Sequence, residues 1–152
     1  MSDDDRTLEA RLRGMWEATD PAPADLAERA LFVLELAGLE TELLRMQEVE
    51  LAGARGEETA RTVTFESEHV AVMVTLSGPP GRARRLDGWI SPAAALDVEA
   101  RTPAASARTT ADAGGRFSFP SLGPALVQLV LHPTGGAAVD LTRPVVTPAI
   151  QI

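Results

Sequence analysis

With 152 residues, of which 45% are hydrophobic, the chain can form one packed domain with a small appendage. It contains no cysteine, which excludes disulfides, thiolate metal sites and cysteine nucleophiles. The first 60 residues hold fifteen acidic and six basic side chains (net −9), whereas the other 92 hold seven and eight (net +1).

An acidic first part repels phosphate backbones and attracts basic protein surfaces. Direct nucleic-acid binding by this part is therefore disfavoured, and its charge either selects a basic partner or only solubilises helices. The opening MSDDDRTLEA lacks the basic and apolar regions of a signal peptide, and no stretch approaches the ~20 apolar residues that cross a bilayer. We therefore expect a cytoplasmic protein that does not enter the membrane.

The acidic part begins with an amphipathic helix. Its large apolar residues follow the spacing i, i+4, i+7 and i+8 that lines one helix face: Leu8, Leu12, Met15 and Trp16. Pro21 disfavours helical backbone at the residue before it, so this helix should end near Thr19. Trp16 continues the apolar stripe and is expected to pack in a core, although tryptophan also often anchors interfaces.

A second helix is expected to begin near Pro23, where the missing N–H of proline is tolerated. Its inner stripe is predicted to comprise three residues: Leu26, Val33 and Leu34. Three further residues make this helix apolar around most of its circumference: Leu31, Phe32 and Leu36. This apolar surface has two explanations. The helices dock on the rest of the chain or on a second copy, which would give a homodimer through the helices, or they bind a different protein. Trp16, Leu31, Phe32 and Leu36 are therefore candidate partner-binding residues.

The pattern after Gly38 predicts a third helix from about Leu39 to Val49, or a continuation of the second helix with a tolerated glycine. The helical segment would then cover residues 1–52. Residues 53–60 would form a linker to a β domain over residues 61–152.

From Arg61 the apolar period changes from 3.6 to 2. Val63 and Phe65 mark one strand face, and the alternation continues through residues 70–76 and 86–90. Turns rich in glycine and proline separate eight or nine short strands, which is typical of an antiparallel sandwich or barrel.

The stretch TTADAGGRFSFPSLGPALVQLVLHP, residues 109–133, resembles the carboxypeptidase regulatory-like, or prealbumin-like, β-sandwich. Asp112 can cap its own turn, the following glycines can take positive φ, and Phe117 and Phe119 can point into one core. The expected fold class is therefore α+β: an N-terminal segment of two or three helices followed by an antiparallel β-sandwich of prealbumin-like or immunoglobulin-like type. This fold alone implies no function.

The whole chain also resembles small uncharacterised proteins of high-GC bacteria whose genes lie beside those of alternative sigma factors. The resemblance is carried by residues 15–46 and 62–74. It implies a regulatory role in which the acidic helices pack on a basic sigma-factor domain. The zinc-binding His and Cys motif of common anti-sigma proteins is absent from the sequence.

Only two histidines, His69 and His132, are available for metal binding or acid–base chemistry. Strand alternation separates His69 from the neighbouring glutamates, so a solvated turn is a better interpretation than a metal site. A hydrolase triad would need a histidine near a serine such as Ser67 or Ser91, and no nucleophile-elbow motif supports it. We therefore predict no catalytic residue, no metal and no cofactor.

Trp89 shares a strand face with Asp87 and is a further candidate anchor for a partner. The sequence therefore favours a non-catalytic interaction or regulatory protein that binds a protein partner, with a sigma factor as one candidate. A small-molecule or carbohydrate-binding sandwich is an alternative, although six aromatic residues without tyrosine argue against a sugar platform. A hydrolase with an unrecognised site is a second alternative.

Overall fold

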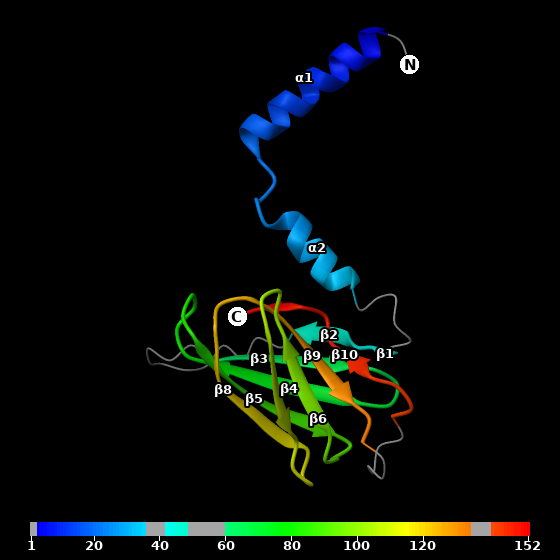
Figure 1. Ribbon diagram of the computed structural model, residues 1–152, viewed down its shortest axis with the longest axis vertical. Helices are drawn as coiled ribbons and strands as arrows, with labels where there is room; N and C mark the ends of the chain where they lie inside the picture. Colours follow the sequence, from blue (N-terminus) through cyan, green and yellow to red (C-terminus); the bar gives the residue numbers. More distant parts are fainter. Residues whose placement is uncertain (1–2, 36–41, 49–59, 135–140) are drawn as a thin grey trace.

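A computed structural model describes residues 3–35, 42–48, 60–134 and 141–152. These described residues form two helices followed by a β-sandwich of two sheets, which confirms the predicted α+β class (Figure 1). The elements are α1 (Asp3–Thr19), α2 (Leu26–Leu34), β1 (Glu42–Leu43), β2 (Arg45–Glu48), β3 (Arg61–Glu66), β4 (Ala71–Ser77), β5 (Arg84–Ser91), β6 (Asp97–Arg101), β7 (Ser106–Thr110), β8 (Arg116–Leu122), β9 (Leu126–His132), β10 (Val145–Val146) and β11 (Ile150–Gln151).

The two sheets pack face to face around one core. The six-stranded sheet has the order β1-β10-β9-β6-β7, with β11 also paired to β9, and the five-stranded sheet has the order β2-β3-β4-β5-β8. The neighbouring strands of the described residues pair antiparallel, except that β1 is parallel to β10.

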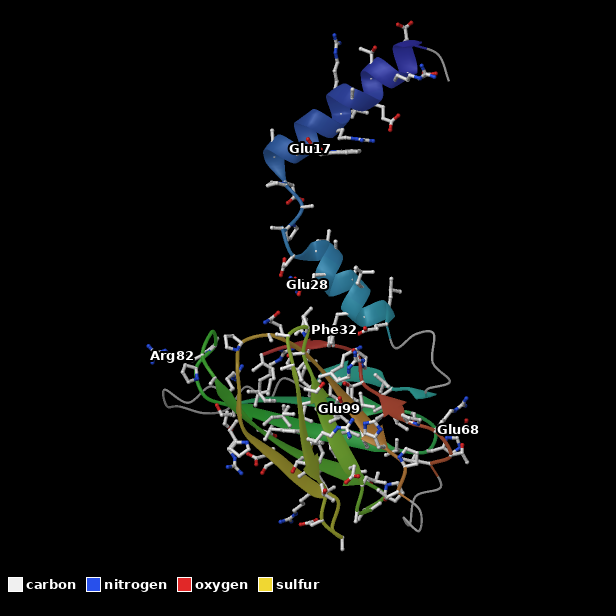
Figure 2. The ribbon with its side chains drawn as sticks, in the orientation of Figure 1. Glu17, Glu28, Phe32, Glu68, Arg82 and Glu99 are labelled. Atoms are coloured by element: carbon white, nitrogen blue, oxygen red, sulfur yellow. The ribbon has the colours of Figure 1, made fainter. Side chains whose placement is uncertain are left out.

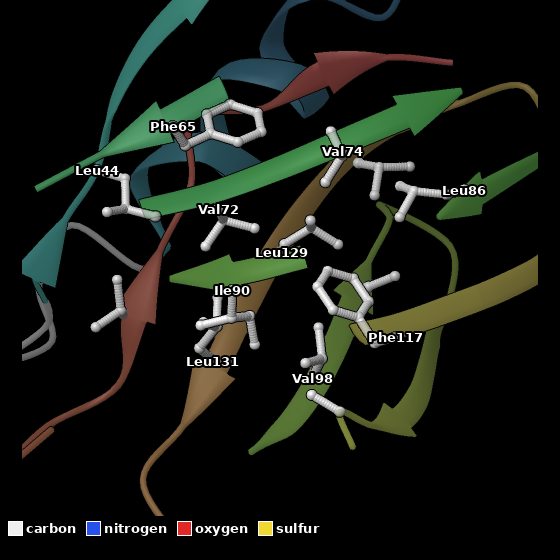
Figure 3. Close-up of a cluster of buried hydrophobic side chains, with 14 of the residues drawn as sticks. Leu44, Phe65, Val72, Val74, Leu86, Ile90, Val98, Phe117, Leu129 and Leu131 are labelled. Carbon is white, nitrogen blue, oxygen red and sulfur yellow. The ribbon is translucent and has the colours of Figure 1, made fainter. Parts of the chain in front are cut away.

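The core follows from the period-2 pattern of the strands. In β4, Val72 and Val74 are fully buried, whereas Met73 between them is exposed. Leu129 and Leu131 of β9 meet them from the opposite sheet (Figure 3). The alternation in the sequence therefore indicated the inner face of these strands correctly.

The turn between β7 and β8 has the structure that its sequence predicts. Asp112 Oδ1 accepts hydrogen bonds from the backbone N–H groups of Gly114 and Arg116, each at 2.9 Å. Gly115 has a φ of 77°, and a Cβ there would lie 2.5 Å from the carbonyl oxygen of Ile90. Glycine is therefore needed both for the backbone conformation and for the close approach to β5.

The predicted third helix is wrong, because residues 42–48 form β1 and β2. β1 pairs with β10 and β2 pairs with β3, so this segment belongs to the sandwich. Leu44, between the two strands, is buried in the core and donates its N–H to the carbonyl oxygen of Val146 at 3.0 Å. Pairing with distant sheet edges thus overrides a local helical pattern. Gly38 and residues 53–59 of the predicted linker lie outside the described residues.

The two helices lie outside the sandwich and are called here the helical arm, residues 3–35. α1 extends away from both sheets, whereas α2 approaches them (Figure 1). α1 ends at Thr19 as predicted, with the Thr19 hydroxyl donating to the carbonyl oxygen of Met15 at 2.8 Å. Among the described residues, no helix has the length and apolar character needed to cross a membrane.

Candidate functional site

The helical arm exposes a stripe of large apolar side chains along α1. Their exposed fractions run from 39% at Leu12 to 63% at Trp16, with Leu8 and Met15 in between. The expectation that Trp16 packs in a core is therefore wrong. Its helix projects from the sandwich, so the described sheets do not cover the stripe (Figure 1).

The opposite face of α1 is polar. Arg13 forms a salt bridge with Glu9, one turn away, at 3.1 Å, and Glu17 also lies on this helix (Figure 2). The arm holds nine acidic and four basic side chains, a net charge of −5. The apolar stripe is therefore set in an acidic surrounding.

α2 contacts the sandwich through its C-terminal end. Phe32 is 6% exposed, and Cζ of Arg101 in β6 lies 5.5 Å from the centroid of its ring, a cation–π contact. Arg101 Nη2 also donates to Glu35 Oε2 at 2.7 Å. Phe32, Glu35 and Arg101 thus join the arm to the six-stranded sheet, and Figure 2 shows Phe32 on the side of α2 nearest the strands.

The predicted inner stripe of α2 is wrong. Leu26, Val33 and Leu34 are exposed. Leu31 is 68% exposed and so remains a candidate for binding a partner, whereas Phe32 is covered by the sandwich. The reason is that α2 meets the sheet with one end and not along its length. Leu36, the remaining helical candidate, lies outside the described residues.

Two adjoining crevices between α2 and the sandwich border this contact. One crevice of about 540 Å³ lies between Leu31, Glu35 and Pro103. A second, of about 270 Å³, separates Arg29 from the turn at Thr102. Most of the α2 surface is therefore accessible.

Two buried polar groups on the six-stranded sheet have no hydrogen-bond partner among the described residues. They are Nη1 of Arg101 and Oε1 of Gln128. The two residues are cross-strand neighbours in β6 and β9. An unsatisfied buried polar group costs about 1–3 kcal/mol, and this cost falls on the part of the sheet that Phe32 and Glu35 contact through Arg101.

A charge cluster surrounds Glu99 on the outer face of the same sheet. His132 Nε2 lies 2.9 Å from Glu99 Oε2, and Arg108 Nη2 donates to the same oxygen at 3.0 Å. Burial would raise the pKa of Glu99, but hydrogen bonds with His132 and Ser106 and the charge of Arg108 outweigh it, so the pKa lies below its ordinary value. Glu99 is therefore ionised at neutral pH and serves as the acceptor for its neighbours.

The two histidines belong to different sheets, and His69 contacts the candidate Ser67 through its backbone N–H. His132 contacts Glu99, whereas His69 is exposed in the turn between β3 and β4. In that turn, Ser67 Oγ accepts hydrogen bonds from the backbone N–H groups of His69 and Val70 at 3.3 and 3.2 Å. The Ser67 hydroxyl is therefore used to form the turn. Within the described ranges, no group of three or more His, Asp or Glu side chains is placed to hold a metal ion.

Trp89 lies on the outer face of the five-stranded sheet, where the strand pattern predicts it, and is 49% exposed. Its Nε1–H donates to the carbonyl oxygen of Gly114 at 3.0 Å, so the Asp112 turn fixes the edge of the indole ring. Its cross-strand neighbours are Met73 in β4 and Arg116 in β8, both exposed. The sequence did not indicate these two neighbours, because strand register between separate segments brings them to Trp89.

The exposed large apolar side chains of the described residues thus lie on two surfaces, the helical arm with α1 and α2 and the face around Trp89. Comparison with known proteins found no match to this chain among family models, curated proteins or solved structures. The chemistry of these two surfaces is the basis for the proposals that follow.

Proposed function

We propose that this protein is a non-catalytic binding protein whose helical arm docks on another protein. The observation that carries the proposal is the exposed apolar stripe of α1, which includes Leu12 and Trp16, on a helix that projects from the sandwich. Most of the stability of a helix in a protein comes from the packing of its apolar face. Covering the stripe would stabilise the helix, and each large apolar side chain that is fully buried contributes roughly 1.5–3 kcal/mol.

The partner that fits this arm has an apolar groove with a basic border. Amphipathic helices bind such grooves through side chains spaced like those on α1. The arm's net charge of −5 favours a basic border and accelerates association. A second copy fits less well, because two equally acidic arms would repel each other.

A sigma factor is the partner that we propose to test first. Its DNA-binding surfaces must be basic to contact phosphates, so an acidic helix docked there would compete with DNA in the cytoplasm. The sandwich would act as a scaffold, held to the arm by Phe32, Glu35 and Arg101. Its Asp112 turn supports assigning it, as part of this proposal, to the carboxypeptidase regulatory-like type.

Trp16 can report the docking directly. The chain has two tryptophans, so in a Trp89→Phe variant Trp16 is the only one left. Titration of this variant with purified alternative sigma factors should produce a saturable blue shift of Trp16 fluorescence. Adding Leu12→Asp should weaken binding at least tenfold, because it places a charge in the buried interface.

The matched control is Ala10→Asp, which adds the same charge on the polar face of α1, beside Glu9 and Arg13. It should change the affinity much less than Leu12→Asp. Equal losses in the two variants would show that only net charge matters and would refute apolar docking. No response to any sigma factor would refute that assignment. A photo-crosslinker at position 12 that captures no protein in the native host would refute docking by the arm.

A further inference from the structure

We propose that the outer face of the five-stranded sheet binds an acidic sugar, with Trp89 and Arg116 as the principal contacts. The site is a shallow depression of about 320 Å³ across β4, β5 and β8. This volume is at the lower end of the range for small-molecule sites. The site is separate from the helical arm and does not depend on the partner proposed for it.

Two rows of outward side chains border the depression, and both follow from the strand register. One row is Met73, Trp89 and Arg116, and the other is Thr75 and Asp87. The rows are two residues apart along each strand, or about 7 Å at ~3.4 Å per residue. The depression is therefore a short groove across the strands, wide enough for a sugar ring lying flat.

Trp89 supplies a flat apolar surface with a fixed orientation. The hydrogen bond to the Gly114 carbonyl holds one edge of the indole, while 49% of the residue stays exposed. Met73 extends the apolar surface on the neighbouring strand. One face of a pyranose ring carries only C–H groups, so stacking it on the indole removes apolar surface from water while the sugar hydroxyls keep their hydrogen bonds.

Arg116 determines the charge of the ligand. Its backbone N–H bonds to Asp112, but its exposed guanidinium has no hydrogen bond or ion pair within the part of the chain that the structure describes. A planar guanidinium binds a carboxylate through two parallel hydrogen bonds. A carboxylate on a ring stacked upon Trp89 would reach its cross-strand neighbour Arg116.

The opposite row favours hydroxyl groups. Asp87 accepts two hydrogen bonds from Arg85, each at 2.7 Å, and a carboxylate offers about four acceptor positions. Asp87 can therefore also accept from ligand hydroxyls, as can the Thr75 hydroxyl, which lies 3.1 Å from that of Thr62. A uronic acid combines an apolar ring face, hydroxyl donors and a carboxylate, whereas a simple aromatic acid offers Asp87 no donor.

Fluorescence of Trp89 tests the proposal in the full chain. In a Trp16→Phe variant, Trp89 is the only tryptophan. This variant is titrated with trigalacturonate and with the neutral galactose trimer of the same linkage. We expect a saturable change with trigalacturonate and at least tenfold weaker binding of the neutral trimer. Arg116→Gln should remove this preference. Arg82→Gln, an exposed arginine outside the depression, should leave it within about twofold.

Several results would overturn the proposal. Equal affinity for the two trimers, or equal losses in Arg116→Gln and Arg82→Gln, would show only non-specific attraction. An unchanged Trp89 signal at millimolar sugar would exclude the site, provided that circular dichroism shows each variant to be folded. A response to an acidic peptide but not to sugar would assign the face to a protein partner. Because the Trp16→Phe variant monitors this face and Trp89→Phe monitors the arm, failure of one proposal is distinguishable from failure of the other.

Discussion

Replacing Gly88 with alanine tests how closely the core packs beneath the Trp89 face. A Cβ at residue 88 would lie 2.1 Å from Cζ of Phe117 and 2.5 and 2.6 Å from its two Cε atoms. Favourable carbon contacts lie at about 3.5–4.0 Å, so the ring would have to move by ~1 Å or more. Phe117 is buried and packs edge-on against Phe119, with ring centroids 6.2 Å apart. The ring therefore has little room to move.

The free energies can be compared directly. Overpacking of a core costs about 1–3 kcal/mol, whereas exchanging glycine for alanine stabilises by about 0.4–1 kcal/mol through the unfolded chain. We expect Gly88→Ala to be destabilised by about 1–2 kcal/mol in urea unfolding. At about 4–8 °C per kcal/mol for a domain of the sandwich's size, the melting temperature should fall by roughly 4–16 °C.

The matched control is Gly123→Ala, where a Cβ meets no atom within 4 Å. It should be neutral or slightly stabilising. Phe117→Leu should recover part of the loss when combined with Gly88→Ala, because it removes the atoms that clash. A Gly88→Ala variant as stable as the native chain, or a double variant whose losses simply add, would refute the steric argument.

Three further predictions concern the charge cluster and the arm. Glu99→Gln should be less stable than the native chain at neutral pH. The difference in the free energy of unfolding should disappear as the pH falls from about 4.5 through the depressed pKa of Glu99, because only the ionised form is stabilised. Urea unfolding down to about pH 3 measures this free energy, and a difference that does not change with pH would contradict the prediction. Phe32→Ala should raise hydrogen exchange in α2 severalfold and leave sandwich unfolding nearly unchanged, whereas Leu31→Ala, at an exposed position, should alter neither. Gly14→Ala should increase the helical circular dichroism of the arm, because the helix propensity of alanine exceeds that of glycine by about 1 kcal/mol and the added Cβ meets no atom within 4 Å. Unchanged ellipticity would mean that α1 is already fully formed.

Much of the sandwich was predictable because its determinants are local. In β4 the alternation of Val72, Met73 and Val74 assigned the inner and outer faces correctly. The Asp112 turn was predictable because its side chain and the following glycines act within four residues. β1 and β2 were missed, since their partners lie in strands far along the chain and the local pattern around Leu44 resembles a helix.

The candidate surfaces were predicted only in part. Trp89 was expected to be exposed because it lies on the strand face opposite to that of Leu86 and Ile90, and it is. Trp16 and the inner stripe of α2 were assigned to a core, since an apolar helix face indicates that something covers it but not what does. The structure shows the sandwich covering Phe32 and leaving Leu31 accessible.

Local pattern was thus sufficient for the α+β class, the end of α1, the inner strand faces and the Asp112 turn, because each depends on residues within a few positions of one another. It was not sufficient for the contacts that define the candidate sites. Glu35 meets Arg101 across 66 positions, and Trp89 is fixed by Gly114, 25 positions away. Such contacts depend on sheet register and on how α2 approaches the sandwich, and these arise only when the whole chain packs.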